Sequence, residues 1–536
     1  GALLERLIAT PLRRGVILVL TLLISGWTIL ALTPPAEYLP EGEEPKTFAR
    51  MSPPPGYSLQ EMASIAEQVE AYFLPHVQAE PDAFLAGDTE VPPLAYMNMR
   101  VAPTQLFIVA EAVDSSHIEA LMEALTNYYE RFPGMRAFAS KGSIISSNDG
   151  GTRSINLDVA GPDLATVYGA ANTLYREAQT QFGNPRIQSQ PSSLSLDQPL
   201  IQIRPDWARV AELGISAEAV GFSVSALGEG AYVDDFFLDD EKIDIYLYGP
   251  QASLPLDQLP NLPLHTPDGY TLPLSAVARI DETMDTSVIR RVDGSRTVTL
   301  NVIPPASIAL EAGVEQAEAM LERLRQEGVL PSTVDVSISG ASDQLNATRE
   351  ALTGNFLIAI VIVYLLLVAI FSHWGYPLLI LTSIPLGVVG GIMGLAAMNG
   401  VGSLLPLIGV APLSQPFDMI TMLGFLILMG TVVNNPILVV DQARRRLHDK
   451  TLSVQEAVSQ AVQTRLRPIA ITTLTTLCGL SPLVFLPGEG TELYRGVGAI
   501  VLFGLLGAAV VTVTFLPALM ISVLKITERR SARSRA

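Results

Sequence analysis

The sequence predicts a membrane protein in which an all-α bundle of six spanning helices is joined to a large exterior α+β region. Three observations predict this fold class. Six apolar segments are each long enough to cross a bilayer, and 49% of the 536 residues are hydrophobic. A long acidic block, residues 36–350, separates the first segment from the second. The basic residues outside that block gather at segment ends that six crossings would place on one side.

The first observation defines the spans. The six segments are roughly Gly15–Leu32, Asn355–Phe371, Pro377–Met398, Ile420–Val440, Ile469–Phe485 and Gly496–Leu524. The first could be a signal peptide, but it runs for about 18 residues and no small-x-small cleavage site precedes Pro34-Pro35. We therefore interpret it as an anchored span.

The charges then define the orientation. Basic clusters precede the first segment (Arg6, Arg13, Arg14), follow the fourth (Arg444, Arg445, Arg446, Lys450, Arg465, Arg467) and follow the sixth (Lys525, Arg529, Arg530, Arg533, Arg535). Positive charge marks cytoplasmic loops, so all three clusters are placed in the cytoplasm. The block 36–350 and the connections 399–418 and 487–495 then face outward.

Composition excludes several classes of protein. The block 36–350 holds 19 basic and 45 acidic residues, a net charge of −26, which argues against nucleic-acid binding and is typical of a soluble domain surface. The single cysteine, Cys478, permits no internal disulfide and no cysteine-based metal site. The chain begins with Gly rather than Met, so we expect a processed, cut or partial chain.

The exterior block shows alternating strand and helix patterns that predict β-α-β units. Capping boxes at Ser58–Glu61 and Ser116–Glu119 begin two helices. Further expected helices are 163–182, 217–226 and 311–326, and expected strands are 106–112, 153–161, 200–203, 242–247, 297–303 and 334–339, with a turn at Asp268-Gly269. The expected organisation is a first transmembrane helix in 1–35, module 1 in 36–150, module 2 in 151–197 and 286–345, an inserted module in 198–285, five transmembrane helices in 346–526 and a basic cytoplasmic tail in 527–536.

Asn434 and Asn435 form a polar pair inside the apolar fourth span. A polar pair in hydrocarbon is costly unless another group bonds to it, so the pair indicates a site for ions, protons or gating. The alternative is a purely structural bond between helices, of about 0.6 to 2 kcal/mol. The residues alone leave both roles open.

Three further features of the spans bear on this pair. Pro436 removes a backbone donor and should loosen the helix directly after the pair. Most of the threonines Thr472, Thr473, Thr475 and Thr476 share one helix face, where they either serve a site or bond to their own backbone. Gly387, Gly390, Gly391 and Gly394 stripe the third span, which predicts close helix packing.

The order of these features resembles one half of a resistance-nodulation-division (RND) permease, a family built from two tandem six-span halves. The similar stretches are Leu39–Glu44, Pro53–Glu61, Arg204–Ser216, Ala231–Phe237, Gly430–Asp441 and Arg465–Thr473. Their order and spacing extend the likeness over nearly the whole chain, which resembles the second, C-terminal half of a hydrophobe or amphiphile (multidrug) exporter. The resemblance implies ferredoxin-like β-α-β modules with an inserted docking module.

The resemblance implies half of a proton-driven efflux transporter in the bacterial inner membrane. In the family, an acid pair in the first half takes up protons, and polar residues of the second half surround it. The matching positions here are Asn434, Asn435, Arg465, Thr472 and Thr473. Position 434 often carries Lys in the family; Asn can only hydrogen-bond, whereas Lys would balance an ionised acid. No acid lies deep in any span, so the first half, fused or separate, is expected to supply the pair.

The resemblance also implies a substrate surface and a docking surface. Exported compounds would bind near Tyr96, Met97, Met99 and Phe107, for which plain core packing is the alternative. Docking would use Val233, Asp234, Asp235 and Phe236.

The implied assembly is a trimer with a periplasmic adaptor and an outer-membrane channel, driven by the proton gradient without a cofactor. A regulatory or assembly subunit that does not transport is the alternative left open by the missing acid pair. Heavy-metal efflux is disfavoured, because no metal-ligand set is evident. Enzyme activity is not expected, since no Gly-x-Ser-x-Gly or His-Glu-x-x-His motif is present.

Overall fold

The computed structural model separates the chain into two compact units. One unit comprises residues 195–289, where we expected an inserted module at 198–285, and the other comprises everything else. The structure describes residues 9–39, 45–142, 152–183, 185–196, 198–228, 230–238, 241–249, 256–286, 288–408, 413–448, 452–486 and 491–533. Parts of the expected segments therefore lie outside the described residues, namely 1–8, 40–44, 143–151, 184, 197, 229, 239–240, 250–255, 287, 409–412, 449–451, 487–490 and 534–536.

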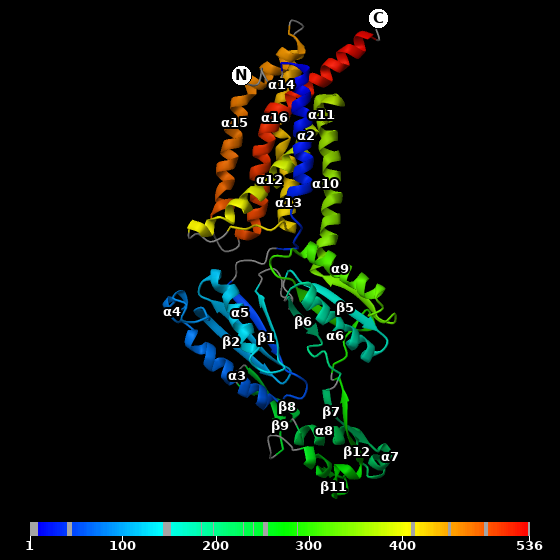
Figure 1. The fold of residues 1–536 in the computed structure, drawn as a ribbon. Coiled ribbons are helices and arrows are strands. Elements are labelled where there is room, and N and C mark those ends of the chain that lie inside the picture. The colour runs from blue at the N-terminus through cyan, green and yellow to red at the C-terminus, as the bar shows by residue number, and fades with distance from the viewer. Residues whose placement is uncertain are drawn as a thin grey trace. The chain divides into compact units, whose positions relative to one another are not determined.

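Six helices of the described residues are long and apolar enough to cross a membrane, as the sequence predicted (Figure 1). They comprise α2 (Pro11–Leu32), α10 (Ala341–Phe371), α11 with α12 (Gly375–Leu381, Ser383–Gly402), α13 with α14 (Met419–Val432, Asn434–Leu447), α15 (Val454–Phe485) and α16 (Thr491–Arg533). A short 3-10 turn, η5, covers Leu405–Ile408. Hydropathy alone placed the start of α15 fifteen residues too late, because its amphipathic first turns follow a capping box between Ser453 and Glu456.

Glycines set a close contact between the helices α12 and α16. A Cβ atom built on Gly390 would lie 3.0 Å from the Cα of Gly507, and one on Gly394 would lie 2.0 Å from the Cβ of Phe503. Only hydrogen fits in these spaces, so the two backbones approach directly. The predicted close packing along the glycine stripe is therefore found, and we call this contact the glycine seam.

Module 1 is a four-stranded antiparallel sheet in the order β2-β3-β1-β4, with helices packed on one face. Its elements are β1 (Lys46–Ser52), α3 (Leu59–Phe73), η1 (Leu74–His76), α4 (Asp82–Leu85), β2 (Leu94–Ala102), β3 (Gln105–Ala112), η2 (Ser115–His117), α5 (Ile118–Tyr129) and β4 (Arg136–Lys141). Alternate strand residues such as Leu106 and Ile108 are fully buried against the helices. The sequence pattern did not predict β1 and β4, because both strands are short and mix charged with apolar residues.

The two capping boxes predicted in module 1 had different outcomes. The first is confirmed, because Ser58 and Glu61 bond reciprocally at the start of α3. The second is wrong. Asp114 accepts hydrogen bonds from both the backbone N–H and the hydroxyl of Ser116, the short 3-10 turn η2 intervenes, and α5 begins after His117 with no side chain capping it.

Module 2 repeats the chain order of module 1. Its elements are β5 (Ile155–Gly161), α6 (Leu164–Gln181), β6 (Arg186–Gln190), β13 (Arg291–Val292), β14 (Ser295–Ile303), α9 (Leu310–Gln326) and β15 (Asp335–Gly340). The strand β14 pairs with both β6 and β5, and β5 pairs with β15, all antiparallel. In module 1 a two-residue turn, Pro103-Thr104, joins β2 to β3. The corresponding connection in module 2, from β6 to β14, is where the inserted module leaves and returns.

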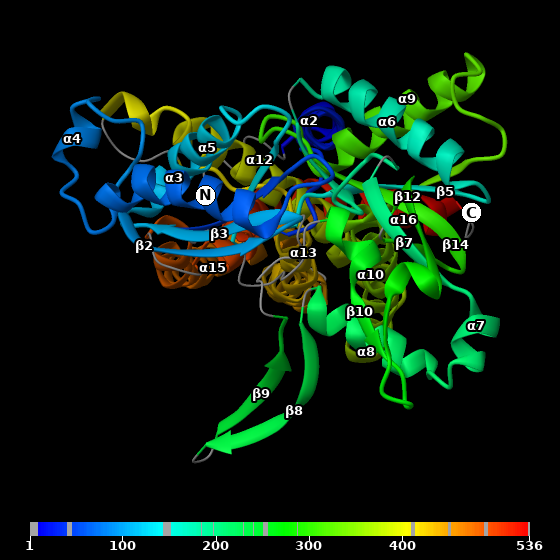
Figure 2. The same ribbon diagram turned by 90° about the horizontal axis from the view of Figure 1, so that it is seen from below.

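The inserted module has its own small core and a long hairpin. Its elements are β7 (Gln198–Pro205), α7 (Trp207–Glu212), α8 (Ala217–Leu227), β8 (Ala231–Leu238), β9 (Glu241–Leu247), η3 (Leu256–Asn261), β10 (Pro263–His265), β11 (Thr271–Pro273), η4 (Leu274–Ala276) and β12 (Ala278–Asp285). Val210, Val220 and Leu274 lie in its core. The predicted turn at Asp268-Gly269 joins β10 to β11, with Gly269 at φ +85°. Figure 2 shows β8 and β9 as a long two-stranded ribbon.

Candidate functional site in the helical bundle

The fourth span is interrupted where the asparagine pair begins. The helix α13 ends at Val432 and α14 begins at Asn434, with Val433 between them. Pro436 lacks the N–H that would bond to the carbonyl of Val432, which accounts for the break predicted there. Asn434 is the sixteenth residue of the 29-residue span Met419–Leu447, so the break lies about halfway across the bundle.

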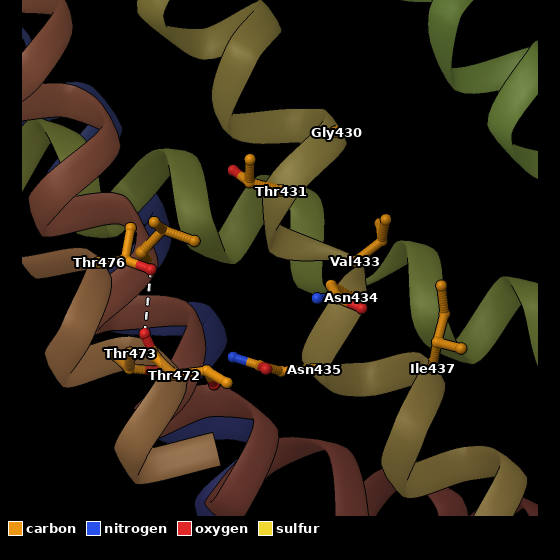
Figure 3. A pocket seen from close by; sticks show the side chains of 10 residues that line it. Gly430, Thr431, Val433, Asn434, Asn435, Ile437, Thr472, Thr473 and Thr476 are labelled. Carbon is orange, nitrogen blue, oxygen red and sulfur yellow. Dashed lines mark hydrogen bonds between the residues drawn. The ribbon is translucent and has the colours of Figure 1, made fainter. Parts of the chain in front are cut away.

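A cavity of about 390 Å³ opens at this break, between the α13–α14 span and α15 (Figure 3). Its lining residues are Gly430, Thr431, Val433, Asn434, Asn435, Ile437, Thr472, Thr473, Thr476 and Leu505. The Asn435 amide points towards the threonines of α15 in Figure 3. The structure therefore brings together four of the five residues predicted from the sequence. It adds Thr431 and Thr476, which helical spacing from Asn434 and Thr472 could have identified.

Three threonine hydroxyls of the cavity, those of Thr431, Thr472 and Thr476, bond to carbonyls of their own helices. Thr472 Oγ1 donates to Pro468 O and Ile469 O, both at 3.1 Å, and Thr476 Oγ1 donates to Thr472 O at 2.9 Å. Thr431 Oγ1 does the same with Leu428 O at 3.0 Å. Of the two roles that the sequence left open for α15, local bonding is present. Because these three hydroxyl protons are used locally, their oxygens face the cavity mainly as acceptors.

The asparagine amides are the strong donors of the cavity. Asn434 is exposed and Asn435 is half-buried, and neither side chain has a hydrogen-bond partner among the residues that the structure describes. Thr431, Thr472 and Thr476 are exposed as well. If these exposed amides faced hydrocarbon at mid-bundle depth, their hydrogen-bonding groups would stay unsatisfied, which is costly in free energy. This side of the bundle therefore requires a polar cover.

Arg465 does not line the cavity. It lies seven residues before Thr472 on α15, about 10 Å along the helix axis. Its Nη2 donates to Gln442 Oε1 of α14 at 3.3 Å. Arg465 thus joins the two helices that flank the cavity, nearer the basic loop than the asparagines.

No carboxylate lines the described walls of the cavity. The acid that follows in α14, Asp441, lies seven residues beyond Asn434 and pairs with Arg445 Nε at 2.9 Å. The cavity therefore offers amide donors and hydroxyl acceptors, but it cannot bind and release a proton by itself.

The four predicted substrate residues lie on two faces of module 1. Met97 and Met99 pack against the buried core with α3 and α5, so core packing is the role that the structure shows for them. Tyr96 and Phe107 lie on the opposite, open face of the sheet. There the guanidinium carbons of Arg50 and Arg100 lie 5.7 and 5.5 Å from the centre of the Phe107 ring.

The predicted docking residues lie on the hairpin β8–β9, where apolar side chains are exposed. Val233 is the extra residue of a β-bulge, and the exposed fractions of Phe236 and Phe237 are 54% and 69%. Asp235 accepts from the Tyr232 hydroxyl at 2.7 Å and pairs with Lys242 at 2.8 Å. Lys242, with Tyr232, lowers the pKa of the Asp235 carboxyl. Within the described residues, no group of three or more His, Cys, Asp or Glu could hold a metal ion.

Comparisons with known proteins all point to the same family. Residues 1–524 match the sequence model of the AcrB/AcrD/AcrF family. The chain is 25% identical to the toluene efflux pump membrane transporter TtgB of Pseudomonas putida, covering 97% of this chain and 48% of that protein. It is 25% identical to the multidrug resistance protein MdtF of Escherichia coli, covering 94% and 47%. The chain therefore spans about half the length of the curated relatives it matches.

Solved structures show the same fold. A crystal structure of a heavy metal efflux pump superimposes with a TM-score of 0.73 at 22% sequence identity, covering 98% of this chain and 52% of that one.

Proposed function

The chain belongs to the AcrB/AcrD/AcrF family of RND permeases, and from that premise we propose that it is one half of a proton-driven efflux transporter. The proposed cargo is hydrophobic or amphiphilic, as in the solvent and multidrug transporters that the chain resembles. The proposed location is the bacterial inner membrane, with both modules and the inserted module in the periplasm. The basic flanks support this orientation.

The observation that carries the proposal is the open polar cavity around Asn434. Its walls supply amide donors at mid-bundle depth, where hydrocarbon cannot satisfy them. A pair of carboxylates on a helix of the other half would accept these hydrogen bonds and would bind protons. The amides would then favour the ionised acids, although less strongly than a lysine in the same place. Binding and release of a proton would change the hydrogen bonds that hold the two halves together.

The lack of a carboxylate among the described lining residues supports assignment to the second half. If this were the acid-bearing half, its cavity would be expected to contain the titrating groups, yet the polar lining that the structure describes consists of Asn and Thr. The equivalent chain order of modules 1 and 2 suggests that both are ferredoxin-like. The exposed apolar hairpin β8–β9 suits contact with another subunit, an adaptor or an outer channel, within a trimeric tripartite pump.

A second candidate function is a regulatory or assembly subunit that does not transport. The same absence of a carboxylate from the described cavity lining favours it. In that case the cavity would still require a polar cover, but the partner's helix would carry no titrating pair.

Dye efflux from cells that produce both halves separates these functions. We expect efflux to require this chain and to stop when a protonophore collapses the proton gradient. An inactive variant of the acid pair in the first half should abolish efflux while the two halves still co-purify. Efflux that continues without this chain, or that ignores the protonophore, would contradict the transport proposal.

A further inference from the structure

The segment after the first span, Ala36–Tyr38, pairs with the beginning of α13; we call this segment the linker. Ala36 forms a parallel β-bridge with Phe417. The N–H of Glu37 donates to Phe417 O at 2.9 Å, and the N–H of Met419 donates to Tyr38 O at 3.1 Å. These backbone bonds lie on both sides of Asp418, which caps α13 by accepting from the N–H of Thr421 at 2.7 Å. The beginning of α13 is therefore fixed to the linker.

The linker also contacts the beginning of α9 in module 2. The N–H of Ala36 donates to Glu311 Oε2 at 2.7 Å, and the N–H of Glu311 donates back to Ala36 O at 3.1 Å. The second bond satisfies one of the N–H groups that a helix N-terminus leaves without a partner inside the helix. The other carboxylate oxygen of Glu311 pairs with Arg349 of α10 at 2.5 Å.

A buried ion pair completes these contacts. Arg153, two residues before β5, lies with its Nε and Nη2 both 3.2 Å from Glu37 Oε1. Its Nη2 also donates to Ile308 O, just before α9, at 2.6 Å. The exposed fractions of the two side chains are 6% and 10%. A planar guanidinium held by several acceptors in a buried place has little freedom to rearrange, so it transmits displacement.

We infer that Glu37 and Arg153 make the linker a mechanical tie between module 2 and the helix that leads to the Asn434 cavity. The inference rests on the proposed function, because it concerns how the cavity is coupled to the exterior. The helix α13 runs without interruption from Met419 to Val432, about 21 Å, and breaks at the cavity. Movement at the cavity would therefore shift α13 as a rod, and the linker would pass that shift to α9 and β5. Glu37 and Arg153 are positioning residues in this scheme, and neither touches the cargo or a proton.

The test uses the complete pump with both halves. We expect Arg153→Ala to reduce the initial rate of dye efflux per folded pump roughly fivefold or more. The melting temperature should fall as well, because the buried Glu37 carboxylate loses this ion-pair partner. Arg153→Lys, which keeps the charge but loses the planar geometry, should restore part of the rate. The matched control is Arg323→Ala, which removes an ion pair of the same module, with Glu177 at 2.9 Å, that does not touch the linker. If Arg153→Ala does not accumulate, Glu37→Gln preserves the shape of the pair and serves in its place.

The distinguishing readout is a double-mutant cycle with Asn434→Ala. If the tie and the cavity act in series, the double variant should export nearly as fast as the slower single variant. The inference would be overturned if the reductions in efflux of the two single variants multiplied in the double variant. It would also be overturned if efflux fell only in proportion to the melting temperature.

A second readout does not depend on export. Spin labels at Ala319 on α9 and Leu423 on α13 should give a broader distance distribution in Arg153→Ala than in Arg323→Ala or the parent chain. An unchanged width would overturn the tie, whether or not the pump exports. If the parent pump exports nothing but Arg153→Ala still broadens the distance distribution relative to the parent, the proposed function is contradicted and the tie stands.

Discussion

The glycine seam and the asparagine cavity are two contacts of one bundle with opposite construction. At the seam, α12 and α16 touch backbone to backbone, and a Cβ on Gly394 would lie 2.0 Å from Phe503. At the cavity, α13–α14 and α15 leave about 390 Å³ between them, lined by polar side chains. A Cβ added to Gly430, in the cavity wall, would meet nothing within 4 Å. The same residue type thus marks a rigid contact in one place and open space in the other.

The difference separates stability from function within the bundle. The glycines and apolar side chains of the seam cannot act on cargo or protons, and their close contact holds two long helices together by dispersion forces. The cavity contributes little packing, and its amides have no partner within the described part of the chain. We therefore expect substitutions at the seam to lower the free energy of unfolding, and substitutions at the cavity to lower the rate of export.

The largest expected effect is at the seam. Gly394→Ala forces a methyl group into the Cβ of Phe503, and overpacking of this kind costs about 1–3 kcal/mol of unfolding free energy. The melting temperature in detergent should fall clearly. Gly430→Ala is the matched control and should leave it unchanged. Equal melting temperatures for the two variants would remove the distinction between seam and cavity.

Asn434→Ala should reduce export and leave the melting temperature unchanged, the opposite of what is expected at the seam. Removal of an amide that bonds to a charged group costs about 1.5–3 kcal/mol, so export should fall roughly ten- to a hundredfold at normal protein levels. Dye efflux and quantitative immunoblotting check both parts. Thr475→Ala, on the same helix as Thr472 but outside the cavity, is the control and should export normally. Normal efflux at normal expression in Asn434→Ala would exclude a role for that amide in export.

A smaller loss of export is expected for Arg465→Ala. The substitution removes the bond to Gln442 between α14 and α15 but leaves the cavity lining intact. We expect only roughly a threefold reduction in efflux, because the bond is long, at 3.3 Å, and lies outside the cavity. Loss of membrane insertion, measured by protease protection of the basic loop, would instead assign Arg465 to topology.

The smallest effect concerns Asp418, which precedes the span that carries the cavity. Burial raises the pKa of its carboxyl from 3.8 to about 6, against the hydrogen bonds from Thr421 that lower it. The folded chain then binds more protons than the unfolded chain between about pH 4 and 6, so stability falls as pH rises through that window. Asp418→Asn should flatten this part of the melting-temperature profile. A slope that persists in the variant would show that another group causes it.

The sequence predicted the features that depend on local pattern. Apolar length located the six spans, the glycine spacing located the seam, and polar residues within hydrocarbon located the cavity. For Met97 and Met99 the sequence left a substrate site and core packing both open, because strand alternation does not say which face of the sheet is covered by helices. The Glu37–Arg153 pair was not foreseen, because its partners are 116 residues apart and only the folded modules bring them together.

The most direct measurement is disulfide cross-linking across the cavity. In a Cys478→Ser background, Thr473→Cys in the cavity wall is paired with a cysteine placed one helical turn from the acid pair of the first half. Oxidation should link the two halves in the intact pump, while Thr475→Cys, outside the cavity, should not form the link. Cross-linking through Thr475→Cys and none through Thr473→Cys would contradict the account, because the polar cavity would then not face the proton-binding half.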